Sequence, residues 1–93
     1  MSLTQLEYFV AIAEVGTVRG AAARLHISQP PLTRHLKALE DELGTPLFHR
    51  TTKGVTLLPQ GEVLLGHARE ILAAVRRAAA VVSASAPPGD HSE

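Results

Sequence analysis

The chain of 93 residues contains no cysteine, no tryptophan, one tyrosine and two phenylalanines. Without cysteine it cannot form a disulfide framework, a thiol nucleophile or a thiolate metal site. It also lacks an uninterrupted apolar run near the roughly 20 residues that span a bilayer. Its N-terminus lacks a basic segment followed by an apolar stretch and a cleavage site. We therefore expect a soluble, cytoplasmic protein with no membrane partner.

The length of the chain allows one small domain. Such a domain builds only a modest core, and much of the 45% hydrophobic content is alanine. Small cores are often completed by burial against a partner or a second copy. We therefore expect the protein to oligomerise.

The formal net charge is zero, with 9 basic and 9 acidic residues, but the charges are unevenly distributed. Residues 15–39 carry Arg and Lys and no acid, and the same holds for residues 43–61. The acidic residues lie outside these stretches, and three of them are adjacent at positions 40–42. The distribution therefore predicts one basic surface on an otherwise acidic molecule.

The first part of the chain predicts two helices. Ser2 and Gln5 form a capping-box pattern, and apolar residues then repeat at helical spacing until Gly16. Thr17 can cap a second, short helix, which Gly20 weakens slightly.

A third helix is predicted over about residues 28–43. Two prolines follow Ser28 and Gln29, in the first turn, where proline is well tolerated, and Gly44 stops the helix. One face of this helix consists of leucines, which are Leu32, Leu36, Leu39 and Leu43.

The second part of the chain predicts a hairpin and a long helix. The pattern over residues 47–57 predicts two short strands around a turn at 51–54. A helix then begins at about Pro59, and its apolar residues form a heptad seam that is too broad for the small body to cover. We therefore expect a second copy to cover it. The predicted dimer contacts are Leu64, Leu65, Ala68, Ile71, Leu72, Val75, Ala78 and Val82.

The third helix has a second face with side chains suited to DNA. At about 100° per residue, Pro30, Thr33, Arg34 and Lys37 lie opposite the leucines. Arginine can donate a forked pair of hydrogen bonds to guanine, threonine offers a hydroxyl and a methyl to thymine, and Gln29 could pair with adenine. The alternative is an ordinary solvated helix face with a proline that only starts the helix.

Two further residues point to the DNA backbone. A Ser28 cap would normally accept from an N–H two or three residues on, but both of those positions are proline. Its hydroxyl is therefore expected to be free to bind a phosphate. Lys53, at the tip of the hairpin, is either a solvated turn cation or a contact to a phosphate or the minor groove.

Several segments together resemble the LysR-type transcriptional regulators of bacteria. They are LTQLEYF at 3–9, AAARLHISQPPLTR at 21–34, LE at 39–40, ELG at 42–44, LFHR at 47–50 and GV at 54–55. The resemblance covers about residues 1–84. It implies a winged helix-turn-helix fold of three helices and a two-stranded wing, followed by a long linker helix that pairs antiparallel with that of a second subunit. It also implies dimers, commonly assembled into tetramers, that bind interrupted inverted repeats of double-stranded DNA in promoter regions.

The resemblance carries over residue by residue. It implies DNA base contacts by Gln29, Pro30, Thr33 and Arg34. Contacts to the DNA backbone, or from the wing, are expected from Ser28, Lys37, Arg50, Thr51 and Lys53. The expected domains are a winged helix-turn-helix over residues 1–58, a linker and dimerisation helix over 59–84, and a flexible tail over 85–93.

The chain departs from the family pattern at three points. Leu58 stands where the family usually has a threonine that caps the linker helix, which puts the start of that helix in question. Gly20 replaces a better helix former. The family's effector domain is expected to be absent, so we expect no small-molecule effector site in this chain, whether it is truncated or naturally short.

A metal site and catalysis are both disfavoured. Four histidines fall in the predicted ordered part, at His26, His35, His49 and His67, but no two are spaced by three or four residues. There is no nucleophile elbow, glycine-rich phosphate loop or paired carboxylate in a plausible pocket, and the acids at 40–42 are expected to form a solvated helix end. We therefore expect no metal, no cofactor and no enzymatic activity.

Two other interpretations remain. One is a coiled-coil interaction module whose head binds protein rather than DNA, and the heptad seam fits it equally well. The acid-free face of the third helix favours DNA. The other is a winged helix of the MarR or another type, against which the SQPPLTR string at 28–34 favours the LysR type.

Overall fold

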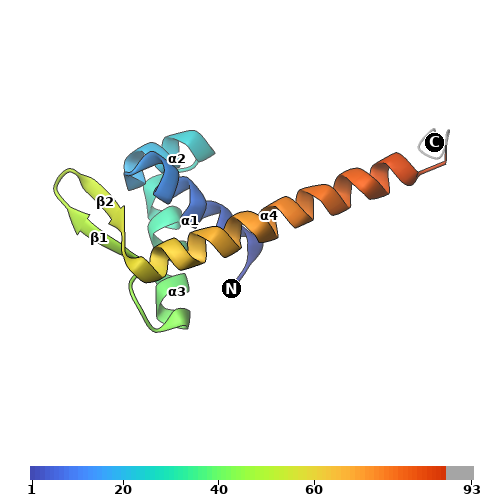
Figure 1. Cartoon of the computed structure of the whole chain (residues 1–93). Helices are drawn as coiled ribbons and strands as arrows, with labels where there is room; N and C mark the ends of the chain where they lie inside the picture. The colour runs from blue at the N-terminus through green and yellow to red at the C-terminus, as the bar shows by residue number, and fades with distance from the viewer. Residues whose placement is uncertain (88–93) are drawn as a thin grey trace.

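The computed structural model describes residues 1–87, and it consists of a small head from which one long helix projects (Figure 1). Within these residues the molecule measures 54 × 26 × 20 Å along its principal axes. The elements are α1 (Leu3–Val15), α2 (Val18–Leu25), α3 (Gln29–Leu43), β1 (Phe48–Thr51), β2 (Gly54–Leu57) and α4 (Pro59–Ser85). Three helices, a two-stranded hairpin and a long final helix are the fold class expected from the sequence.

The helix ends follow the capping residues. The Gln5 N–H donates to Ser2 Oγ at 3.1 Å, and the Ser2 N–H donates to Gln5 Oε1 at 3.0 Å, so the predicted capping box is confirmed. Gly16 ends α1 in the left-handed conformation, with φ 88°. Thr17 Oγ1 accepts from the Gly20 N–H at 3.0 Å and so begins α2.

Packing explains why position 20 is glycine, which the sequence did not indicate. A Cβ at this position would lie 2.6 Å from Val15 Cγ1 and 2.8 Å from Thr17 Oγ1. A larger residue would therefore push against the side chain that caps α2. The absence of a side chain costs helix propensity but leaves room for the cap.

The core surrounds α1, which contacts each of the other helices and β2. The rings of Phe9 and Phe48 lie 5.4 Å apart between centroids, and they join the wing to the helices. Because these side chains leave water together, they supply the main stabilisation of the head. The buried residues are Leu6, Phe9, Ala11, Ile12, Ala21, Ala22, Leu32, Leu36, Leu39, Leu47, Phe48, Ala68 and Leu72.

A tight turn joins α2 and α3. His26 caps α2 in the left-handed conformation, with φ 59°, which a residue with a Cβ adopts only at some cost. The Ile27 N–H donates to the Ala22 carbonyl at 3.0 Å, which closes the turn. This turn sets the relative directions of α2 and α3, the arrangement of a helix-turn-helix.

The wing is attached to the head beside its turn. The Val55 N–H donates to the Gly16 carbonyl at 2.9 Å. The Leu58 N–H donates to the Leu47 carbonyl at 3.0 Å, which extends the pairing of the two strands. Gly54 has φ 140°, and a Cβ there would collide with the Gly16 carbonyl oxygen. The hairpin therefore lies against the junction of α1 and α2, as Figure 1 shows.

The long helix begins without a side-chain cap. Leu58 occupies the cap position, and Pro59 is the first helical residue, as expected from the sequence. The helix extends to Ser85, one residue into the tail expected over 85–93. The rest of that prediction falls mostly on residues 88–93, which lie outside the described residues. No described helix is both long enough and apolar enough to cross a membrane.

Candidate nucleic-acid interface

The two faces of α3 have the predicted character except at Leu43, the last residue of the helix, which is 40% exposed rather than buried. The leucines at 32, 36 and 39 are buried, whereas Gln29, Pro30, Thr33, Arg34 and Lys37 are exposed. The helix is thus held by one face and presents the other to solvent. The structure therefore brings together on one exposed surface all four side chains expected to contact bases.

Ser28 caps α3 with its backbone only. Its side chain makes no capping hydrogen bond, because the second and third helical positions are proline. The hydroxyl lies at the helix N-terminus, where the helix dipole favours an anion. It is free of a capping bond, as the sequence predicted.

His35 belongs to the packing rather than to the exposed face. Its ring meets the ring of Tyr8 edge-on, with centroids 5.0 Å apart and planes at 88°. Gln5, Arg34, His35 and Ala38 line a shallow hollow of about 290 Å³ between α1 and α3. Arg34 therefore stands at the edge of the exposed face that lies nearest to α1.

Lys37 is the one candidate cation on α3 with a carboxylate partner among the described residues. Its Nζ lies 3.5 Å from Asp41 Oδ1, one helical turn on, and both side chains are more than half exposed. Such a pair stabilises a helix by only about 0.2–0.5 kcal/mol, so a phosphate can replace the carboxylate at small cost.

The candidate wing residues divide into two kinds. Thr51 Oγ1 accepts from the Lys53 N–H at 3.2 Å and donates to the Gly54 carbonyl at 3.3 Å. Thr51 therefore shapes the turn, a role that sequence reasoning did not assign to it. Arg50 and Lys53 are exposed, and within residues 1–87 neither forms an ion pair.

An ionic cluster on another side of the head uses part of the basic stretch. Glu14 Oε1 lies 2.7 Å from Arg24 Nη2, and Glu14 Oε2 lies 3.1 Å from Arg69 Nη2, so one carboxylate joins α1, α2 and α4. The hydrogen bond from Arg24, followed by that from Arg69, lowers the pKa of Glu14 below its ordinary value of 4.5. Arg24, which contributes to the basic stretch in sequence, therefore serves the fold.

The acids at 40–42 are not simply a solvated helix end, and that expectation is wrong in two respects. Glu40 Oε2 accepts from the Leu47 N–H at 2.8 Å, which fixes the start of the wing to the end of α3. Glu42 holds the N-terminal ammonium of Met1 at 2.7 Å. Neither contact follows from a local pattern, because the partners are seven and 41 residues away in sequence.

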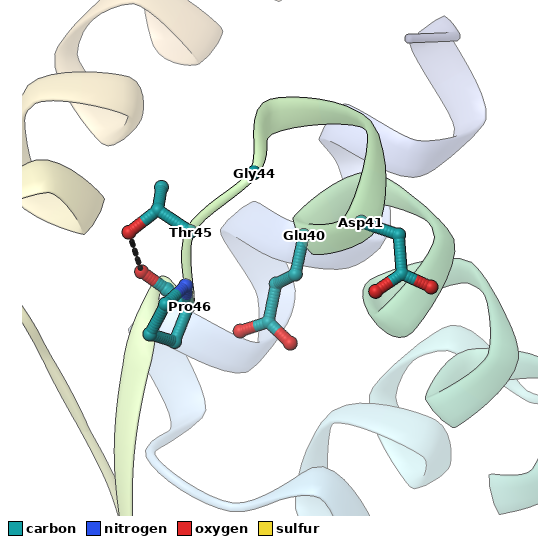
Figure 2. A pocket seen from close by; sticks show the side chains of 5 residues that line it. All are labelled: Glu40, Asp41, Gly44, Thr45 and Pro46. Carbon is teal, nitrogen blue, oxygen red and sulfur yellow. Dashed lines mark hydrogen bonds between the residues drawn. The ribbon is translucent and has the colours of Figure 1, made fainter.

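The turn after α3 encloses a second hollow, of about 400 Å³ (Figure 2). Glu40 and Asp41 lie on one side of it, and on the other the Thr45 hydroxyl donates to the Pro46 carbonyl at 3.3 Å. Because two carboxylates line this hollow, it repels phosphate and does not extend the candidate DNA surface.

The seam residues of α4 do not all remain available to a second copy. Ala68 and Leu72 are 0% and 8% exposed because they pack against the head, so they leave little surface for the dimer contact expected of them. Leu64 and Leu65 are half-buried against the same core. The seam residues with free surface are Ile71, Val75, Ala78 and Val82.

Other clusters of chemistry-bearing side chains are few. Within residues 1–87, no group of three or more His, Asp or Glu side chains could hold a metal ion. His67 Nδ1 instead lies 3.7 Å from Glu70 Oε1 on the same helix.

Comparisons with known proteins agree on one family. The model described as "Bacterial regulatory helix-turn-helix protein, lysR family" matches residues 3–62. The HTH-type transcriptional regulator TfdT of Cupriavidus pinatubonensis is 54% identical over 77 residues, which are 83% of this chain and 34% of TfdT. The chain therefore spans about a third of the length of that relative.

Solved structures of DNA complexes have the same fold. In a complex of the DNA-binding domain of CbnR with DNA, the protein is 44% identical and has a TM-score of 0.88, over 94% of this chain and all of that one. In a complex of the BenM DNA-binding domain with catB site 1 DNA, it is 36% identical with a TM-score of 0.88, over 94% of this chain and 99% of that one.

Proposed function

Since the chain belongs to the LysR family of bacterial regulatory helix-turn-helix proteins, we propose that it binds double-stranded DNA in a sequence-specific way and so regulates transcription in the cytoplasm. Residues 1–58 act as the DNA-binding head and residues 59–84 as the dimerisation helix. The segment over about 28–43 enters the major groove, and the wing over 47–57 lies on the backbone or in the adjacent minor groove.

The observation that carries this proposal is the exposed face of α3. Gln29, Pro30, Thr33 and Arg34 lie together on it, and no acid occurs between Val15 and Leu39 to oppose a phosphate. The acid of α3 that pairs with Lys37 is Asp41, which lies nearer the C-terminal end of the helix. A surface that docks another protein has little reason to keep its N-terminal part free of acids. The likeness to DNA-bound domains of CbnR and BenM supports the same conclusion.

The contacts divide by their chemistry. Arg34 and Gln29 read base edges by paired hydrogen bonds, and Thr33 and Pro30 add methyl and apolar contacts. Contacts to the DNA backbone carry no information on the base sequence, but they fix the register of the head on the duplex. We assign them to Ser28, Lys37, Arg50, Thr51 and Lys53.

Two copies act together. Ile71, Val75, Ala78 and Val82 form an apolar face on α4 that is accessible to a second copy. Pairing of these helices in antiparallel directions places two α3 helices in successive major grooves, which fits an interrupted inverted repeat in a promoter. A longer protein that contains this segment can join two such dimers into a tetramer.

The proposal is tested by fluorescence anisotropy of the full chain on two duplexes, one from upstream of its own gene and one with the same bases scrambled. Each duplex is measured at two salt concentrations, because phosphate contacts make affinity fall steeply with salt. We expect tighter, salt-sensitive binding to the first duplex.

The same measurement can reject the proposal. No binding to either duplex by a protein that circular dichroism shows to be folded and sedimentation shows to be dimeric would leave the coiled-coil interaction module as the better interpretation. Equal binding to both duplexes would contradict base reading but keep the backbone contacts.

A further inference from the structure

Arg19 is a basic residue to which neither the fold nor the contacts proposed above give a role. It is exposed at the second position of α2. Among residues 1–87 it forms no ion pair with any acid. The first turn of α2 contains no acidic residue either.

The other arginine of α2 shows which way Arg19 points. Arg24 binds Glu14 on the side of the helix that faces α1 and α4. At about 100° per residue, the five steps from Arg19 to Arg24 turn the helix by about 500°, which leaves the two side chains about 140° apart around its axis. Arg19 therefore projects from the flank of α2 that lies away from the Glu14 cluster.

The attachment of the wing brings a second exposed cation to this flank. The Val55 N–H donates to the carbonyl of Gly16 at 2.9 Å, and Gly54 packs so closely that a Cβ would lie 3.2 Å from Thr17 Cγ2. Lys53 is the next residue in the wing, and Arg19 is two residues from Thr17. The turn of the wing and the start of α2 thus lie side by side, and each carries an exposed cation.

We propose that Arg19 is a further contact to the DNA backbone, and that it binds a phosphate on the strand that the wing meets. This inference rests on the proposed function and extends it to α2. Neither cation pairs with a carboxylate of residues 1–87, so both are available to phosphates of the duplex, and binding there releases condensed counterions. A planar guanidinium can also bind a phosphate through two hydrogen bonds.

The test compares Arg19→Gln with Arg77→Gln, which makes the same charge change on the exposed distal part of α4. Affinities of the full chain for the upstream duplex and for its scrambled form are measured by anisotropy over a range of salt. For Arg19→Gln we expect affinity to fall by about 3- to 10-fold on both duplexes. The slope of log affinity against log salt should become shallower by about 1 for each subunit, whereas Arg77→Gln should leave it unchanged.

A conservative variant separates contact from folding. Arg19→Lys keeps the charge, so the slope should return to within error of the unaltered protein, although the affinity stays lower because lysine cannot bind bidentately. Thermal melts of all three variants should coincide with that of the unaltered chain.

Two outcomes would overturn the inference. If Arg19→Gln and Arg77→Gln give the same slope while the unaltered protein binds DNA, Arg19 makes no phosphate contact and the proposed function stands. If the unaltered, folded dimer binds neither duplex, the proposed function fails and the inference fails with it.

Discussion

The two halves of α4 belong to the same helix but have different environments. Up to Leu72 the helix packs against α1 and contributes buried residues to the head, whereas from residue 74 to Ser85 every side chain is exposed. A helix that projects into solvent with valines on its surface leaves apolar area in water. The head therefore completes its own core, whereas the distal half of α4 leaves an apolar face open, which is the face proposed for the second copy.

The charges of the molecule show a parallel division. The arginines that pair with Glu14 join the helices of the head, whereas Arg34, Arg50 and Lys53 form no ion pair within residues 1–87. The same residue type therefore serves the fold on one side and the proposed DNA contact on the other.

The largest effect is expected in the distal half of α4. Val75→Asp places a charge on the apolar face, and burying it in a dimer without a partner costs about 3–5 kcal/mol. Analytical ultracentrifugation should show monomers at concentrations where the unaltered chain is dimeric, with the melt of the head preserved. Ala80→Asp, about 140° around the helix, is the control and should stay dimeric; loss of the dimer in both variants would contradict the assigned face.

The next effect is expected at the turn of the wing, where Gly54 packs against α1. Gly54→Val forces a branched side chain into a φ of 140° and against the Gly16 carbonyl oxygen, so we expect the head to lose about 2–4 kcal/mol of unfolding free energy. Gly66→Ala is the control, because a Cβ there meets no atom within 4 Å. Denaturant titration of both variants measures the difference, and equal stability would show that the wing is not held at Gly16.

The third effect distinguishes a contact to the bases from a contact to the DNA backbone. Arg34→Ala should cost about 1–3 kcal/mol of binding to the upstream duplex and reduce the preference over scrambled DNA. Lys53→Ala should weaken binding to both duplexes by the same factor. Anisotropy of the two variants on the two duplexes decides the matter: equal losses for Arg34→Ala on both duplexes would remove its base-reading role.

The smallest effect concerns Glu14. Its pKa is lowered in the folded state, so its contribution to stability is present above its ordinary value of 4.5 and is lost as the pH falls through the folded value. Glu14→Gln should therefore lower the unfolding free energy by about 0.5–1 kcal/mol at pH 7 and by less at pH 3. Urea titrations at both pH values check this, and Glu70→Gln, on the exposed face of α4, should show a smaller difference between them.

Much of the fold follows from local pattern. The capping box at Ser2 and Gln5, the glycines that end α1 and α3, and the prolines after Ser28 each act within one helical turn, so the sequence alone locates these helix ends. The two faces of α3 follow from its periodicity, because its leucines must leave water. Helical spacing alone therefore suffices to place the four base-reading candidates on one face.

Other features depend on residues far apart in the sequence. The pairing of Glu14 with Arg24 and Arg69, and of Glu40 with the Leu47 N–H, requires elements to be packed before the partners meet. The division of the heptad seam has the same origin, because Ala68 and Val75 are both regular seam positions. Only the position of α1 decides that the first is covered by the head and the second is left for another copy.

The amino-acid sequence by itself determined the helices, the hairpin, the family and the exposed face of α3, since these depend on spacing and local hydrogen bonds. The tertiary structure alone decided which cations pair with a carboxylate. Arg19 and Arg24 both lie on α2 in the acid-free stretch of residues 15–39, but among residues 1–87 a carboxylate from another helix, that of Glu14, lies beside Arg24 alone. Whether a charge holds the fold or faces DNA depends on what the packed chain places within about 4 Å of it.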